Sequence, residues 1–297
     1  MKLSFARLSV VQRNAELLTS AMGVPRDAPP DHAYRRALNS LQGWTDRPDA
    51  GTALFFQGGT HADASFSHFL TGYDIPPVVP FEAADTSVIS AAIDESLDLL
   101  HRLDADARAT FDFLIHALLV VRIPAFGSLS DALGWVLAGP EATWSRLEMA
   151  ELLWHEALHQ ALFLFDLVDP IFRTDGAGVA AAAASVLNPV LGEDRPYDLA
   201  FHGVAVSLSI VDLHLRAGSV RHAEQLLSTL SDAVDHLTAL RGLLTARGVG
   251  VLEELEQAQH TLARDLSTNT IPVTEYPGER PTRRSYLDLQ PAWRPGT

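Results

Sequence analysis

The stretch Leu152–Asp169, LLWHEALHQALFLFDLVD, predicts a long buried helix with an H-E-x-x-H motif at its centre. Residues four apart lie about 40° apart around a helix axis, one turn along it. His155 and His159 therefore project from one face and can bind one metal ion. Glu156 stays close enough to touch a ligand on that metal. The flanking residues are apolar on nearly all sides, which is typical of a buried helix.

Burial makes this motif informative. Two imidazoles and a carboxylate inside an apolar helix cost free energy unless a ligand or a partner satisfies them. The five-residue pattern also recurs by chance, and paired histidines can simply hydrogen-bond in a core. A metal site and a structural histidine pair are both consistent with the motif, and the apolar context favours the metal site.

The composition is that of a globular protein with a strong acidic balance. The chain has 297 residues, 47% of them hydrophobic and 20% charged, and a formal net charge of −15. This charge argues against binding to nucleic acid or to an anionic membrane, since both use basic patches. The start, MKLSFARLSVVQRN, is too polar for a signal peptide, and no segment approaches the ~20 uninterrupted apolar residues of a membrane span. A cytoplasmic location is expected, and the oligomeric state is left open.

The metal site needs a third protein ligand. Cysteine is absent, so the ligand must be His, Asp or Glu. Leu162 and Phe165 stand where the longer H-E-x-x-H-x-x-G-x-x-H motif of metzincins has Gly and His, which excludes that class. His202 is the candidate, because it lies in the apolar segment LAFHGVAV beside Gly203, where a ligand could approach closely. A core histidine is the alternative at this position.

The other histidines are expected to be structural or exposed. His214 follows His202 by twelve residues, which places it on another face of the same helix. His222 and His236 lie among polar residues and are expected to be exposed. His116 is alone in an apolar run and is expected to be a core histidine. In the N-terminal part, His61 and His68 are expected to be surface or packing residues.

Helical periodicity dominates the rest of the chain. Further helices are predicted over residues 1–24, 31–41, 86–102, 104–121, 197–215, 220–246 and 251–266. A short strand is expected at Gly134–Ala138, just before the motif helix. This order is similar to that of zincin cores, where the strand borders the cleft and can pair with an extended peptide. The predicted fold is therefore mainly α, a helical bundle around a zincin-like H-E-x-x-H helix with a short strand or small sheet bordering the cleft.

Proline-rich connections divide the chain into three predicted parts. Residues 1–80 form an N-terminal helical cap segment that ends in the proline-fixed connection YDIPPVVP. Residues 81–266 form the metal-binding helical core. Residues 267–297 hold five prolines and are predicted to be an extended tail.

Three segments together resemble the HExxH-motif proteins encoded beside genes for the maturation of ribosomal peptides. They are GWVLAGP from residue 134, AELLWHEALHQALFLFDLVDP from residue 150, and DRPYDLAFHGVAVSL from residue 194. The family pattern is a strand, H-E-x-x-H, a Leu-rich continuation with an Asp, an Arg-Pro, and His-Gly-Val at the start of a helix. Here these positions are filled by His155, Glu156, His159, Asp166, Arg195-Pro196 and His202-Gly203-Val204.

This resemblance implies an Fe(II)/2-oxoglutarate-dependent oxygenase that hydroxylates the β-carbon of a residue in a ribosomally made precursor peptide. The implied Fe(II) ligands are His155, His159 and His202, which leave positions open for 2-oxoglutarate and O₂. Glu156 would orient a metal-bound water or the substrate, and the peptide is expected along Gly134–Ala138.

The distal carboxylate of 2-oxoglutarate needs a cation, for which Arg is suited because it binds carboxylates through two parallel hydrogen bonds. Arg195 is the candidate because it lies shortly before His202. Arg122 and Arg247 are expected to be surface or structural arginines.

Two other classes of protein are consistent with the same residues. In a zinc metallopeptidase, Zn²⁺ would lower the pKa of its water and Glu156 would take the proton as general base. In a non-catalytic helical binding protein, the histidines would be structural. Spacing along the sequence does not separate these classes.

Overall fold

The computed structural model describes residues 2–25, 28–42, 51–56, 81–121, 126–128, 130, 132–140, 144–175, 185–188 and 193–268. The chain forms two compact units. One contains Met1–Val10 and Ala161–Glu279, and the other contains Val11–Gln160 and Arg280–Thr297. Among the described residues the units divide at Val10/Val11 and at Gln160/Ala161, each time inside a helix.

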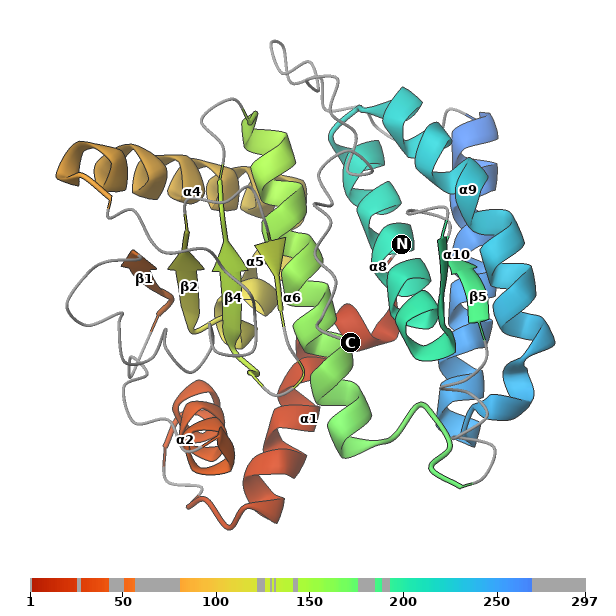
Figure 1. Ribbon diagram of the computed structural model, residues 1–297, viewed down its shortest axis with the longest axis horizontal. Coiled ribbons are helices and arrows are strands. Elements are labelled where there is room, and N and C mark those ends of the chain that lie inside the picture. Colours follow the sequence, from red (N-terminus) through yellow and green to blue (C-terminus); the bar gives the residue numbers. More distant parts are fainter. Residues whose placement is uncertain are drawn as a thin grey trace. The chain divides into compact units, whose positions relative to one another are not determined.

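A four-stranded sheet forms the centre of the unit that contains Val11–Gln160. Its strands are β1 (Ala53–Phe56), β2 (Ala117–Val120), β3 (Phe126–Gly127) and β4 (Trp135–Ala138). Their order is β1-β2-β4-β3, with the first three parallel and β3 antiparallel to β4. Figure 1 shows the three parallel strands side by side. β2 and β4 are buried along their whole length, as expected for parallel strands covered on both faces.

The helices of this unit include α1 (Leu8–Ala21), α2 (Pro30–Gln42), α4 (Ala83–Leu103) and α5 (Ala105–Leu114). Asp104 separates α4 from α5, and its carboxylate accepts a hydrogen bond from the backbone N–H of Ala107, 2.9 Å away, as an N-cap. His116 lies between α5 and β2 with no exposed surface, so the prediction of a core histidine is confirmed.

The motif helix is α6 (Arg146–Val168), with the H-E-x-x-H motif near its centre. Its start is fixed by a capping box. The Ser145 N–H donates to Glu148 Oε2 at 2.7 Å, and the Glu148 N–H donates to Ser145 Oγ at 3.2 Å. At the other end, Asp166 Oδ1 accepts a hydrogen bond from the N–H of Ile171 at 2.6 Å, in the turn that follows Pro170.

The unit that contains Ala161–Glu279 is mainly helical. Its elements include η1 (Ser4–Ala6), β5 (Ser185–Asn188), β6 (Glu193–Pro196), α8 (Tyr197–Arg216), α9 (Val220–Ala239), η2 (Arg241–Leu243) and α10 (Ala246–Thr268). β5 and β6 form an antiparallel pair that packs against α8 and α9, and α10 packs against the same two helices (Figure 1). The buried Tyr197 hydroxyl donates to the Leu237 carbonyl at 3.0 Å and so ties α8 to α9.

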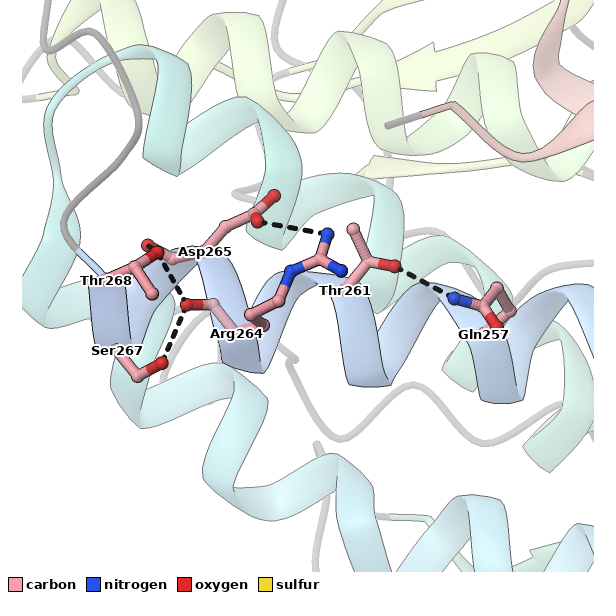
Figure 2. Close-up of polar contacts among 6 residues, drawn as sticks. All are labelled: Gln257, Thr261, Arg264, Asp265, Ser267 and Thr268. Atoms are coloured by element: carbon pink, nitrogen blue, oxygen red, sulfur yellow. Dashed lines mark hydrogen bonds and ion pairs between the residues drawn. The ribbon is translucent and has the colours of Figure 1, made fainter.

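The last turns of α10 are held by local polar contacts (Figure 2). The hydroxyls of Ser267 and Thr268 both donate to the carbonyl of Arg264, at 2.7 and 2.9 Å. Carbonyls in the last turn of a helix lack partners in the helix itself, so these side chains take over that role. One turn earlier, Gln257 Nε2 donates to the Thr261 hydroxyl at 3.2 Å.

The predicted fold class is confirmed, because the protein is mainly helical with a small mixed sheet. The expected strand before the motif helix is β4. The helix predicted over residues 104–121 is wrong in its second half. The apolar run after Leu114 forms β2, because a sequence that is buried on every side fits a central parallel strand as well as a helix.

The predicted division of the chain differs from the observed units. β1 comes from the predicted cap segment of residues 1–80, yet it pairs with β2 in the sheet. The observed units divide within α1, at Val10/Val11, and within α6, at Gln160/Ala161, rather than near residue 80. The connection predicted at Tyr73–Pro80 and the tail over residues 267–297 lie outside the described residues, apart from the end of α10. His61, His68 and Arg122 also lie outside them.

One described helix, α8, is long and apolar enough to cross a membrane by composition. However, 72% of its apolar window is buried inside the protein. This burial is typical of the core helix of a soluble protein.

Candidate functional site: the H-E-x-x-H helix

His155 and His159 face the same side of α6, as the motif predicts. Their Nε2 atoms are 3.1 Å apart and their rings meet at 71°. His155 is 7% exposed and His159 is half-buried. At this distance the two imidazoles can share a hydrogen bond, and both Nε2 atoms are close enough to bind one metal ion.

Burial lowers the pKa of His155 well below its usual value. The neighbouring His159 lowers this pKa further, whereas the Glu151 carboxylate raises it. The neutral form of His155 is therefore favoured at neutral pH. Neutral imidazole is the form that binds metal ions.

The two nitrogens fit a single transition-metal ion. Metal–imidazole bonds are about 2.1 Å long, so nitrogens 3.1 Å apart would subtend an angle of about 95° at an ion bound to both. This value is close to the angle between neighbouring ligands in an octahedral site and somewhat below that of a tetrahedron. The donor set is consistent with Fe(II) and with Zn²⁺, both of which accept imidazole.

Glu156 is 4% exposed, and burial raises the pKa of its carboxyl group from 4.5 to about 7. The nearby Ser128 hydroxyl partly opposes this rise. One carboxylate oxygen of Glu156 lies 3.9 Å from Nε2 of His155. A carboxyl group that titrates near pH 7 can both accept and give up a proton under physiological conditions, which suits a general acid or base.

Gln160 joins the motif helix to the sheet. Its Oε1 accepts a hydrogen bond from the Gly134 N–H at 2.7 Å, and its Nε2 donates to the Trp135 carbonyl at 3.3 Å. Gly134 has a positive φ of 84°, a backbone conformation that favours glycine, and this turn directs the chain into β4. A side chain one residue after His159 therefore fixes α6 against the start of β4.

The expectation that a peptide lies along Gly134–Ala138 stays a prediction, and the sheet limits how a peptide could pair there. β4 pairs with β2 along its whole length, and on its other side Leu137 and Ala138 pair with β3. The outer positions of the described sheet belong to β1 and β3. β3 leads directly to Ser128, the residue whose hydroxyl acts on Glu156.

His202 lies near the start of α8 and is 7% exposed. Its ring packs against Phe163, with centroids 5.3 Å apart, and against Phe172 at 6.2 Å. Burial lowers its pKa to about 4, so the ring is neutral. His202 belongs to the unit with Ala161–Glu279, whereas His155 and His159 belong to the other, and its role as third ligand stays a prediction.

Arg195 is half-buried in β6, directly before α8, and its backbone pairs with Val186. Its contact with 2-oxoglutarate stays a prediction. Arg247 has a structural role. Its guanidinium lies 3.3 Å from the Asp169 carboxylate and stacks over the Phe165 ring, 4.6 Å from the centroid.

Three residues close to the H-E-x-x-H motif were not predicted from the sequence: Glu151, Gln160 and Ser128. Glu151 is 6% exposed and precedes His155 by one helical turn, so helical spacing alone could have identified it. Gln160 follows the motif directly, but its partners Gly134 and Trp135 are known only from the fold. Ser128 is distant in sequence and gives no signal of its own.

A separate hollow of about 290 Å³ lies between α9 and α10, where its acidic lining residues include Asp235, Glu253 and Glu256. None of its lining residues is a predicted site residue. The Thr238 hydroxyl donates to Glu256 at 2.6 Å, so this carboxylate already has a partner within the hollow. The chemistry of the H-E-x-x-H motif is therefore not located in this hollow.

No protein-family model matches the chain, and a search of curated proteins finds no match.

Proposed function

We propose that this protein is a metal-dependent enzyme that modifies a peptide, with His155 and His159 as metal ligands. The observation that carries the proposal is the pair of buried imidazole nitrogens 3.1 Å apart, next to a buried carboxyl group with a pKa of about 7. Burying these groups costs free energy that a metal ion would offset. A purely structural histidine pair would not require Glu156 to be buried beside it.

The proposed reaction is hydroxylation of the β-carbon of a residue in a ribosomally made peptide, in the cytoplasm, with Fe(II) and 2-oxoglutarate. The resemblance of the motif string supports this choice of metal and cosubstrate. When bound, the two would supply the oxidising power for breaking a C–H bond. His202 would complete the ligand set, and Arg195 would hold the distal carboxylate of 2-oxoglutarate.

The residues of the chain would perform three tasks. His155, kept neutral by burial, would bind the metal without first losing a proton, and His159 would bind the same ion from the next turn of α6. Glu156 would hold a proton or accept one beside the metal. An extended peptide that pairs with the sheet would add at the β3 edge, which leads to Ser128 and Glu156.

A zinc metallopeptidase is the second candidate, and the pKa of Glu156 favours it specifically. A carboxyl group with a pKa near 7 is well matched to taking a proton from a zinc-bound water and passing it to a leaving amine. Both candidates use the same two histidines, so the metal and the cosubstrate distinguish them.

The test is to add Fe(II) and then 2-oxoglutarate to metal-free protein under anaerobic conditions. The oxygenase predicts a weak visible charge-transfer band that needs both additions, and succinate formation once O₂ is admitted. His155→Ala and His159→Ala should abolish the band, whereas His101→Ala, at an exposed position on α4, should leave it unchanged. Arg195→Met should weaken 2-oxoglutarate binding and leave Fe(II) binding intact.

Two outcomes would count against the oxygenase. A protein that holds Zn²⁺ tightly, cleaves peptides and ignores 2-oxoglutarate is the metallopeptidase. If the two alanine variants bind metal as well as His101→Ala does, the H-E-x-x-H pair is structural and neither enzyme is correct.

A further inference from the structure

A second histidine pair lies within the unit that contains Ala161–Glu279. His214 in the last turn of α8 and His222 in the first turn of α9 have ring centroids 4.2 Å apart. His214 is 2% exposed, and His222 is half-buried rather than exposed as its polar neighbours predicted. The two residues are eight positions apart, and the turn between the helices brings them together.

We propose that His214 and His222 form a second metal site, one that binds a divalent transition-metal ion and is separate in its residues from the H-E-x-x-H pair. Ring nitrogens of the two residues lie within 4.8 Å of one another. Two imidazoles bound to one ion at about 2.1 Å have nitrogens roughly 3–4 Å apart. A small rotation of either side chain is therefore enough to reach this geometry.

The turn that joins α8 to α9 fixes the backbone on which His214 and His222 stand. The Ser219 N–H donates to the His214 carbonyl at 2.8 Å, and the Gly218 N–H donates to the Leu215 carbonyl at 3.1 Å. Gly218 has a φ of +74°, which lets the chain reverse immediately after α8. Because these bonds fix the backbone on both sides of the pair, little conformational entropy is lost when the two rings bind one ion.

The charge around His214 also favours a cation. His214 lies in the last turn of α8, where the carbonyl ends of the helix carry partial negative charge. The nearest basic residue in that turn, Arg216, is neutralised by Asp212, whose carboxylate lies 2.9 Å from its Nε. Imidazole ligands select borderline ions such as Zn²⁺, Ni²⁺, Co²⁺ and Cu²⁺ over Mg²⁺ and Ca²⁺.

The experiment is a titration of metal-free, full-length protein with Zn²⁺, with bound metal measured by equilibrium dialysis. His222→Gln should lose one equivalent of bound zinc, or bind it at least about ten-fold more weakly. His236→Gln is the matched control, since His236 is exposed on the same helix. The half-buried position of His222 makes its replacement less disruptive to folding than that of His214.

A variant that lacks the H-E-x-x-H histidines distinguishes zinc bound by this pair from zinc bound at the proposed active site. In a His155→Ala/His159→Ala variant, one equivalent should remain and should disappear when His222→Gln is added. Loss of every equivalent in the double alanine variant would overturn the second site and leave the proposed function standing. Equal zinc binding by His222→Gln and His236→Gln would show that the pair is only a packing contact.

Discussion

At the scale of single residues, Glu156 is the acidic group of the H-E-x-x-H motif whose titration burial changes most clearly. Its carboxyl group is buried, and its pKa is raised from 4.5 to about 7. The folded protein therefore keeps a proton that the unfolded chain releases at lower pH. The stabilising contribution of this group is fully present below about pH 4.5 and is lost as the pH rises through about 7.

The first prediction concerns the metal-free protein. Replacing Glu156 by Gln removes a charge that is costly to bury at high pH. The stability of Glu156→Gln relative to the wild type should therefore increase between about pH 4 and about pH 8, by up to about 3 kcal/mol. The free energy of urea unfolding at the two pH values measures this change. An unchanged difference between the two proteins would mean that Glu156 is not buried as a protonated acid.

His202 gives the internal control, because its pKa shift has the opposite consequence. Burial lowers this pKa from 6.5 to about 4, so only the unfolded chain takes up a proton between those values. Stability is full above about pH 6.5 and falls as the pH falls toward 4. His202→Phe keeps the packing against Phe163 and Phe172 and should remove that loss.

At the scale of elements, Gln160 links the motif helix to the strand beside it. It satisfies two backbone groups at the start of β4, one of them the Gly134 N–H. Gln160→Leu leaves these groups buried without partners, which should lower the free energy of unfolding by about 2–4 kcal/mol. Gln257→Leu is the control because Gln257 is exposed on α10, where it donates to the Thr261 hydroxyl, and it should change stability by less than about 0.5 kcal/mol.

The Gln160→Leu variant also tests whether this side chain keeps α6 and its two histidines in position for metal binding. If α6 and β4 are held together by this side chain, Gln160→Leu should weaken metal binding as well as stability. An equal loss of stability in Gln160→Leu and Gln257→Leu, measured by thermal unfolding, would show that the hydrogen bonds of Gln160 to β4 contribute little to stability.

The elements that could be predicted from the sequence are those with a local signal. The spacing of His155 and His159 predicted a shared helix face, and the glycines around β4 predicted the strand. β2 was not predicted because its run of buried residues has no period that separates a strand from a helix. Ser128 affects the pKa of Glu156 only because the fold brings the two residues near one another, so no sequence pattern could identify it.

At the scale of the whole molecule, stability depends on contacts between segments that are far apart in the chain. The turn after α6 meets the start of α10 about 75 residues later. Thr245 Oγ1 donates to the Pro170 carbonyl at 2.6 Å, and the Thr245 N–H donates to the Ile171 carbonyl at 2.9 Å. A bridge between Phe172 and Leu244 runs beside these bonds. This junction holds the segment that follows the motif helix.

Gly248 makes the junction possible, because a Cβ at this position would collide with the Ile171 carbonyl oxygen. Gly248→Ala should therefore lower the free energy of unfolding by about 1–3 kcal/mol, despite the better helix propensity of Ala. Gly250 lies in the same helix, and no atom outside its own stretch of helix comes within 4 Å of the place that an alanine methyl group would take there. Gly250→Ala should therefore raise stability by about 0.5–1 kcal/mol. Urea unfolding of the two variants gives the comparison. Stabilisation by both would mean that the backbone of α10 does not approach Ile171 closely, and that the junction is looser than these contacts require.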